Sequence, residues 1–242
     1  MRYKNLTIIG TSHIAKQSLD EVKTAIEEEK PSLIALELDK RRLYSLMAGK
    51  NAKKGLPNIF KIGVKGFLFS LIGAWAEKKL GEYVGVAPGS EMKQAVRLAK
   101  KNKIELALID QDIEITLKRL SKTLSWREKW NFLVDVFRAV VLKEKEVEFD
   151  LTQVPEEKII RKLVGKVKKR YPNIYKVLIV ERNDIMARRL INIIKERPDD
   201  KVLAIMGAGH EKEIIDIIKK GINKVDITYS ISLAGKTQNI YI

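Results

Sequence analysis

The sequence has no cysteine, and only two of its 242 residues are histidine. The absence of cysteine excludes disulfide bonds, thiolate metal sites and a cysteine nucleophile. The chain also has no low-complexity tract, and its hydrophobic content of 45% is too high for intrinsic disorder. A chain of this length and composition can bury a sizeable core and is typical of one domain or two small ones.

Long apolar runs are also missing. The N-terminus leads directly into an apolar strand pattern, without the apolar region and small-residue cleavage site of a secretory signal. The longest uncharged stretch in the middle of the chain, residues 66–76, has 11 residues, whereas a spanning helix needs about 20. We therefore expect a cytoplasmic or membrane-associated protein, with no signal peptide and no transmembrane span in this chain.

Acidic residues are outnumbered, because 47 Lys and Arg stand against 31 Asp and Glu and the formal charge is +16. Such an excess suggests an anionic partner such as nucleic acid, a phosphate-bearing ligand or a lipid surface. Abundant Lys, Glu and Ile without cysteine is also typical of hyperthermophile chains. The basic residues are interleaved with aliphatic core positions and form no recognition motif, so we expect no nucleic-acid partner.

Positive charge is concentrated in residues 40–79, which contain ten Lys or Arg and a single acid, Glu77. Because this segment also contains Phe67, Phe69 and Trp75, it could lie on an anionic membrane surface. The alternative is a lid or dimer surface that buries the same residues against protein, as amphipathic helices of soluble proteins commonly do. An exposed apolar segment of this kind, together with a helical arm, makes a homodimer reasonable.

The alternation of apolar strand patterns with helical patterns predicts an α/β fold, with a largely parallel central sheet flanked by helices. A fifth strand is predicted at 226–231, after a helix that ends at Gly221. Almost no strand pattern occurs between 113 and 197, so we predict a single α/β domain over 1–242 with a helical insertion at about 113–197. Four strands precede loops with polar residues, and they are predicted at 6–9, 33–36, 105–109 and 201–206.

Both histidines end a Gly-x-x-His loop directly after an apolar strand, in GTSH at 10–13 and GAGH at 207–210. Ligands of parallel sheets bind beyond the carboxyl ends of the strands, so we expect His13 and His210 at one edge. Gly10 and Gly207 would let the backbone turn sharply and leave room for a ligand. Alternatively, the two histidines only cap helices or join loops by hydrogen bonds.

Carboxylates follow other strands and should reach the same edge: Glu37, Asp39, Asp110 and Asp112. Two imidazoles and several carboxylates suit a divalent transition metal such as Zn, Mn, Co or Fe, and we expect Mn, Co or Zn. Glu37 would act either as a general base that activates the attacking water or as a ligand that completes a His–His–Glu set. A structural pair with Arg41 or Arg42 is a third possibility for Glu37 or Asp39.

Three further charged residues are weaker site candidates. Glu91 stands in the first turn of a predicted helix, where the helix dipole alone favours an acid. Glu181 and Arg182 interrupt the apolar face of the helix VLIVERNDIMA. That interruption indicates a buried pair or a site contact, although a solvated helix turn explains it nearly as well.

Six stretches occur in a characteristic order: IIGTSHIAKQSLDEV (8–22), PSLIALELDKRR (31–42), PGSEMKQAV (88–96), LIDQDIEITLKRL (108–120), ERNDIMARRL (181–190) and IMGAGHEKEI (205–214). Together they resemble the TraB/PrgY pheromone-shutdown family, within the wider Tiki and EreA/ChaN-like grouping. The resemblance implies an EreA/ChaN-like fold and a metal-dependent, peptidase-like hydrolase. In that reading His13, His210 and Glu37 form the metal and catalytic centre, with Glu91 as a further metal candidate.

The remaining site candidates surround this centre, near the substrate or behind the metal ligands: Arg42, Asp110, Glu181 and Arg182. Two positions depart from the family's usual pattern, because Gln111 and Asn183 stand where it usually has arginine and aspartate. The expected substrate is a peptide or a small molecule. The alternative function is a non-catalytic protein that binds or sequesters a peptide or small ligand at or near a membrane.

Overall fold

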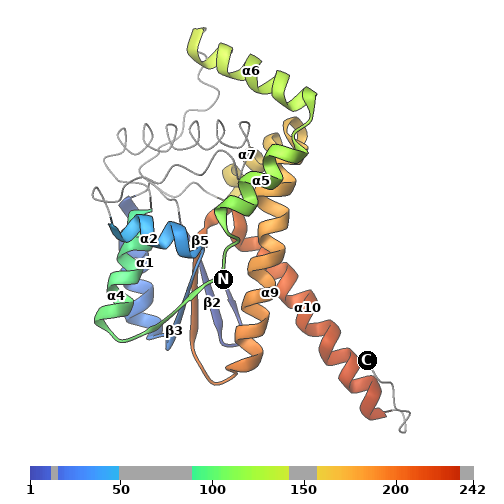
Figure 1. Cartoon of the computed structure of the whole chain (residues 1–242). Coiled ribbons are helices and arrows are strands. Elements are labelled where there is room, and N and C mark those ends of the chain that lie inside the picture. Colours follow the sequence, from blue (N-terminus) through green and yellow to red (C-terminus); the bar gives the residue numbers. More distant parts are fainter. Residues whose placement is uncertain (12–15, 49–88, 142–156, 235–242) are drawn as a thin grey trace.

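The computed structural model describes residues 1–11, 16–48, 89–141 and 157–234 (Figure 1). It confirms the predicted α/β fold, because five strands form one sheet in the order β1-β2-β5-β3-β4. All neighbouring strands are parallel except β1 and β2, which pair antiparallel. The strands are β1 (Arg2–Tyr3), β2 (Leu6–Thr11), β3 (Leu33–Leu36), β4 (Glu105–Leu108) and β5 (Val202–Gly207).

Two layers of helices cover the sheet, with α1 (Lys16–Glu29) and α4 (Ser90–Lys101) on one face and α9 (Glu181–Glu196) and α10 (Ala208–Ala234) on the other (Figure 1). Successive strand residues point to opposite faces. Ala204 of β5 therefore packs toward α9 and α10, and the next residue, Ile205, packs toward α1 and α4. Because both faces of β3 and β5 are covered, these strands are apolar without alternation.

Other helices lie beyond the carboxyl edge of the sheet (Figure 1). They are α2 (Lys40–Ala48), α5 (Ile113–Thr123), α6 (Trp126–Val141), α7 (Glu157–Arg170) and α8 (Pro172–Tyr175), and a π-helical segment, η2 (Lys176–Val180), continues α8 into α9. The described part of 113–197 contains helices and no strand. Its last helix, α9, packs directly on the sheet.

The predicted strand at 226–231 is wrong, because those residues belong to α10. The predicted helix end at Gly221 is wrong for the same reason. A Cβ atom at Gly221 would lie 2.9 Å from Ile191 Cδ1, so this glycine allows close packing of α10 on α9. The β-branched residues of 226–231 favoured a strand locally, but the helix continues through them.

The basic segment predicted to reach a membrane or a partner falls largely outside the described residues, as do residues 66–76. Only its first part, up to Ala48, is described, and it forms α2. Among the described helices, none combines the length and the hydropathy that a membrane crossing requires.

Glu128 joins the start of α6 to the start of α8. Its carboxylate accepts hydrogen bonds from the Ser125 backbone and hydroxyl and from the backbone and side chain of Asn173, and its side chain is buried. Burial alone would raise the pKa of Glu128, but the hydrogen bonds from Asn173 and Ser125 outweigh it and hold this pKa below its usual value.

We expect Glu128→Gln to lower the free energy of unfolding by about 1–2 kcal/mol at neutral pH, as loss of a helix cap does. A carboxylate with a lowered pKa stabilises the fold above its unfolded pKa of about 4.3, and this contribution is lost as the pH falls through the folded value. The difference between the two proteins should therefore narrow below about pH 4. Urea unfolding at several pH values measures it, and a constant difference would contradict the interpretation.

Candidate functional site

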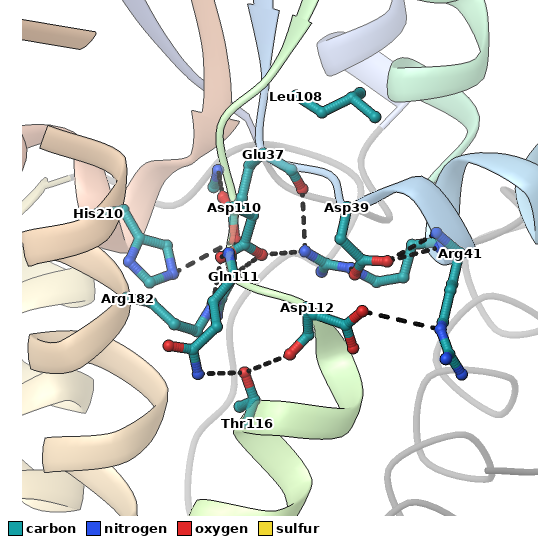
Figure 2. Close-up of polar contacts among 12 residues, drawn as sticks. Glu37, Asp39, Arg41, Leu108, Asp110, Gln111, Asp112, Thr116, Arg182 and His210 are labelled. Carbon is teal, nitrogen blue, oxygen red and sulfur yellow. Dashed lines mark hydrogen bonds and ion pairs between the residues drawn. The ribbon is translucent and has the colours of Figure 1, made fainter. Parts of the chain in front are cut away.

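Glu37, directly after β3, is the centre of a buried polar cluster at the carboxyl edge of the sheet (Figure 2). Its side chain is 3% exposed. Oε2 accepts a hydrogen bond of 2.6 Å from the backbone N–H of Gly207, at the end of β5, and Oε1 pairs with the Arg182 guanidinium. Since β3 and β5 are neighbours, the sheet itself brings these groups together.

Arg182, in the first turn of α9, joins Glu37 to Asp110 (Figure 2). Its Nε donates to Asp110 Oδ1 at 3.0 Å, and its Nη2 donates to Oδ2 at 2.8 Å, so this pair is bidentate. Burial alone would lower the pKa of Arg182, but the charges of Glu37 and Asp110 and the hydrogen bonds to them raise it above its usual range. The guanidinium therefore stays charged and compensates two buried carboxylates.

Arg42, near the start of α2, approaches the cluster from the solvent side. Its guanidinium pairs with Asp110 and with Asp39, 2.8 Å from the Asp39 Oδ2. The Arg42 side chain is 30% exposed, against 13% for Arg182. Of the two arginines of the cluster, Arg42 is thus the one that faces solvent.

Asp39 and Asp112, expected at the same edge, act as helix caps. Asp39 accepts hydrogen bonds from the first backbone N–H groups of α2, and Asp112 accepts one of 2.8 Å from the backbone of Glu114 in α5. Gln111, a departure from the family pattern, donates a hydrogen bond from its side-chain amide to the hydroxyl of Thr116 in α5.

His210, in the first turn of α10, faces Glu37 (Figure 2). Its Nε2 lies 3.5 Å from Glu37 Oε1. Its other ring nitrogen, Nδ1, lies 2.6 Å from Asn183 Oδ1 of α9. The imidazole is buried, so both nitrogens are held by protein groups at defined positions.

His13, expected to share the site, lies outside the described residues. The last described residue before it, Thr11, pairs with Gly207, and Gly10 pairs with Met206. Within the described residues no three histidine and acidic side chains are grouped closely enough to hold a metal ion. The described part of the site thus offers two donor groups, from Glu37 and His210.

Gly10 allows close packing between β2 and the start of α10. A Cβ atom there would lie 2.9 Å from the Cα of Ala208 and 2.6 Å from Glu211 Oε2, at the start of α10. The sequence pattern predicts that Gly10 and Gly207 provide turns and space for a ligand. The space beside Gly10 is filled by the helix that carries His210, so this glycine sets the distance between β2 and α10.

Two other candidates stand in first helical turns, Glu91 in α4 and Glu181 in α9. Glu91 is buried in the first turn of α4, on the α1 side of the sheet. Glu181 forms a bidentate pair with Arg119 of α5, in which Arg119 Nε lies 3.1 Å from Glu181 Oε2. Adjacent residues of α9 thus have different partners, because Arg182 reaches the buried cluster and Glu181 faces α5.

Sequence reasoning missed the groups behind His210. Asn183 Nδ2 donates to Glu213 Oε2 at 2.7 Å, and the Tyr175 hydroxyl donates to Glu213 Oε1 at 2.8 Å. One signal was available, because Glu213 follows His210 by three residues and therefore shares its face of the helix. The partners on α8 and α9 could not be found without knowing how these helices pack against α10.

Comparisons with a family model and with individual proteins point to the same family. A model of the TraB/PrgY/gumN family matches residues 2–220. An uncharacterised protein of Methanocaldococcus jannaschii is 36% identical over 231 residues, which are 92% of this chain and 55% of the relative. TraB domain-containing proteins of Bos taurus and Homo sapiens are 22% and 20% identical over 187 residues, which are 73% of this chain and 49% of each relative. The chain thus spans about half the length of these relatives.

Proposed function

This chain belongs to the TraB/PrgY/gumN family, and from that premise we propose that it is a metal-dependent, peptidase-like hydrolase. His13, His210 and Glu37 would hold a divalent transition metal, Mn, Co or Zn. The observation that carries the proposal is the approach of His210 Nε2 to Glu37 Oε1, at 3.5 Å, between two buried side chains.

The separation of these two atoms fits a shared metal ion. Ligand atoms at about 2.0–2.1 Å from a tetrahedral metal lie roughly 3.3–3.4 Å from each other. A nitrogen and a carboxylate oxygen are also the donors that such metals accept from proteins. His13 would complete a His–His–Glu set, the three-ligand pattern that leaves one position open for catalysis.

The sheet register supports a contribution from His13. Thr11 lies beside Gly207, and the two chain steps from Thr11 to His13 span at most about 7 Å. Gly207 itself donates to Glu37. The first Gly-x-x-His loop therefore starts next to the backbone group that holds the proposed ligand Glu37.

The charges of the cluster also favour a bound cation. Glu37, Asp39 and Asp110 bring three carboxylates, whereas Arg42 and Arg182 bring two guanidiniums. With neutral histidine the cluster has one excess negative charge. A cation beside Glu37 would compensate this charge, which is costly to bury alone.

The residues of this chain would divide the work of hydrolysis. A divalent metal held by His13, His210 and Glu37 would supply a Lewis acid for the scissile carbonyl and would lower the pKa of water. Arg182 and Gly207 hold the carboxylate of Glu37 in place, and the solvent-facing Arg42 would contact the substrate. Peptides and small amides or esters have the carbonyl that this chemistry requires.

Elemental analysis of the purified chain, followed by a peptide-library cleavage screen with added Mn, Co and Zn, tests the proposed function. We expect about one metal ion per chain and cleavage that stops on chelation and returns with the metal. A protein that binds peptides equally well after chelation and cleaves none of them would instead be the non-catalytic binder. Strong salt dependence of that binding would point to the basic residues as its origin.

A further inference from the structure

A series of hydrogen bonds runs behind His210, on the side of the ring away from Glu37. It connects Tyr175, Glu213, Asn183 and the ring nitrogen Nδ1, with distances of 2.8, 2.7 and 2.6 Å. Tyr175, Asn183 and His210 are buried. Water therefore does not replace these partners, and the direction of each hydrogen bond follows from the chemistry of the groups.

The direction is set at Glu213. A carboxylate only accepts hydrogen bonds, so Asn183 must turn its NH₂ group toward Glu213 and its carbonyl oxygen toward His210. Burial and the hydrogen bond to Glu213 raise the pKa of Tyr175 to about 12, so its hydroxyl keeps the proton that it donates. The Asn183 oxygen is an acceptor, and His210 Nδ1 must therefore carry a hydrogen.

We propose that Asn183, oriented by Glu213, is a positioning residue that fixes neutral His210 as the Nδ1–H tautomer. Nε2 is then the unprotonated ring nitrogen, and its lone pair lies on the side of Glu37. The use of this lone pair to bind a metal rests on the proposed function, because only an unprotonated ring nitrogen is a ligand. The tautomer itself is a property of the metal-free chain.

The tautomer can be measured by long-range ¹H–¹⁵N NMR of chelator-treated, ¹⁵N-labelled protein at about pH 9, where imidazole is neutral. The chain has two histidines, and the spectrum of His13→Ala assigns His210. We expect the Nδ1–H form to exceed the Nε2–H form by about tenfold or more, the ratio that one buried hydrogen bond can support. A majority of the Nε2–H form would overturn the proposal.

Two variants test the role of Asn183. Asn183→Leu removes the acceptor, and the ring should then place its hydrogen on Nε2, toward the Glu37 carboxylate 3.5 Å away. Glu213→Gln keeps the shape but lets the amide of Asn183 turn either way, so both tautomers should appear. Lys212 is an exposed neighbour on the same helix, and Lys212→Ala should give the same spectrum as the parent protein. An unchanged tautomer in both Asn183→Leu and Glu213→Gln contradicts the proposal.

The result separates this inference from the proposed function. A chain that binds no metal but shows the Nδ1–H form supports the positioning role and contradicts only the hydrolase. A chain that binds metal, but whose metal-free form has mostly the Nε2–H tautomer of His210, contradicts only the positioning role. If the parent protein binds metal, Asn183→Leu should lower the metal affinity by about 10–100-fold, the usual cost of removing a hydrogen-bond partner behind a metal ligand.

Discussion

Replacing Arg182 with methionine should lower the free energy of unfolding by about 3–5 kcal/mol, the cost of leaving a buried charge without its partner. Arg182 bonds to both Glu37 and Asp110, whose side chains are 3% and 1% exposed. Its removal leaves Glu37 without its guanidinium partner and takes the bidentate partner from Asp110. Methionine fills a similar volume, so the loss reports charge and hydrogen bonding rather than a cavity. Urea unfolding followed by circular dichroism measures it.

Arg197→Met is the matched control for this measurement. Arg197 also forms a bidentate pair with an acid, Glu105, at 2.5 and 2.8 Å, but both partners are substantially exposed. Exposed ion pairs contribute little, because water and salt screen them. We expect almost no change in this control. Equal losses in the two variants would show that the burial of Glu37 and Asp110 does not decide the effect.

The sequence predicted the strands that carry the site because each is a short apolar run next to a loop. Strands 33–36 and 201–206 correspond to β3 and to nearly all of β5, and the edge they share holds Glu37 and Gly207. The prediction for 226–231 failed because propensity is a weak guide where a helix is already propagating. Local preference could identify strands of the core but not the length of α10.

The polar partners of the site were only partly predictable. Arg182 could be noticed because a charge on the apolar face of a helix must find a partner. Its partner Asp110 is 72 positions away, and no local pattern specifies that pairing. Asp39 and Asp112 lie after the strands as expected, but both also cap helices, as acids directly before helices commonly do. Site and cap look alike until the direction of each side chain is known.

His13→Ala should abolish metal binding as completely as His210→Ala. Loss of a group that only supports a ligand costs about 10–100-fold in affinity, and loss of a ligand should cost at least as much. The sheet register places Thr11 beside Gly207 and therefore starts both Gly-x-x-His loops at one edge. Titration calorimetry of metal-free protein with Mn, Co and Zn measures the affinities, with Lys212→Ala as a control expected to bind like the parent.

The pattern of losses decides which atoms form the site. Loss in His210→Ala alone would mean that the first loop does not contribute, and the metal would then need other donors than a His–His–Glu set. Loss in neither variant would leave the approach of His210 to Glu37, at 3.5 Å, as an internal hydrogen-bonding contact of the fold. Loss of metal binding in both variants would mean that one ion joins two histidines nearly two hundred residues apart in the sequence. The parallel pairing of β2 and β5 makes this arrangement geometrically available.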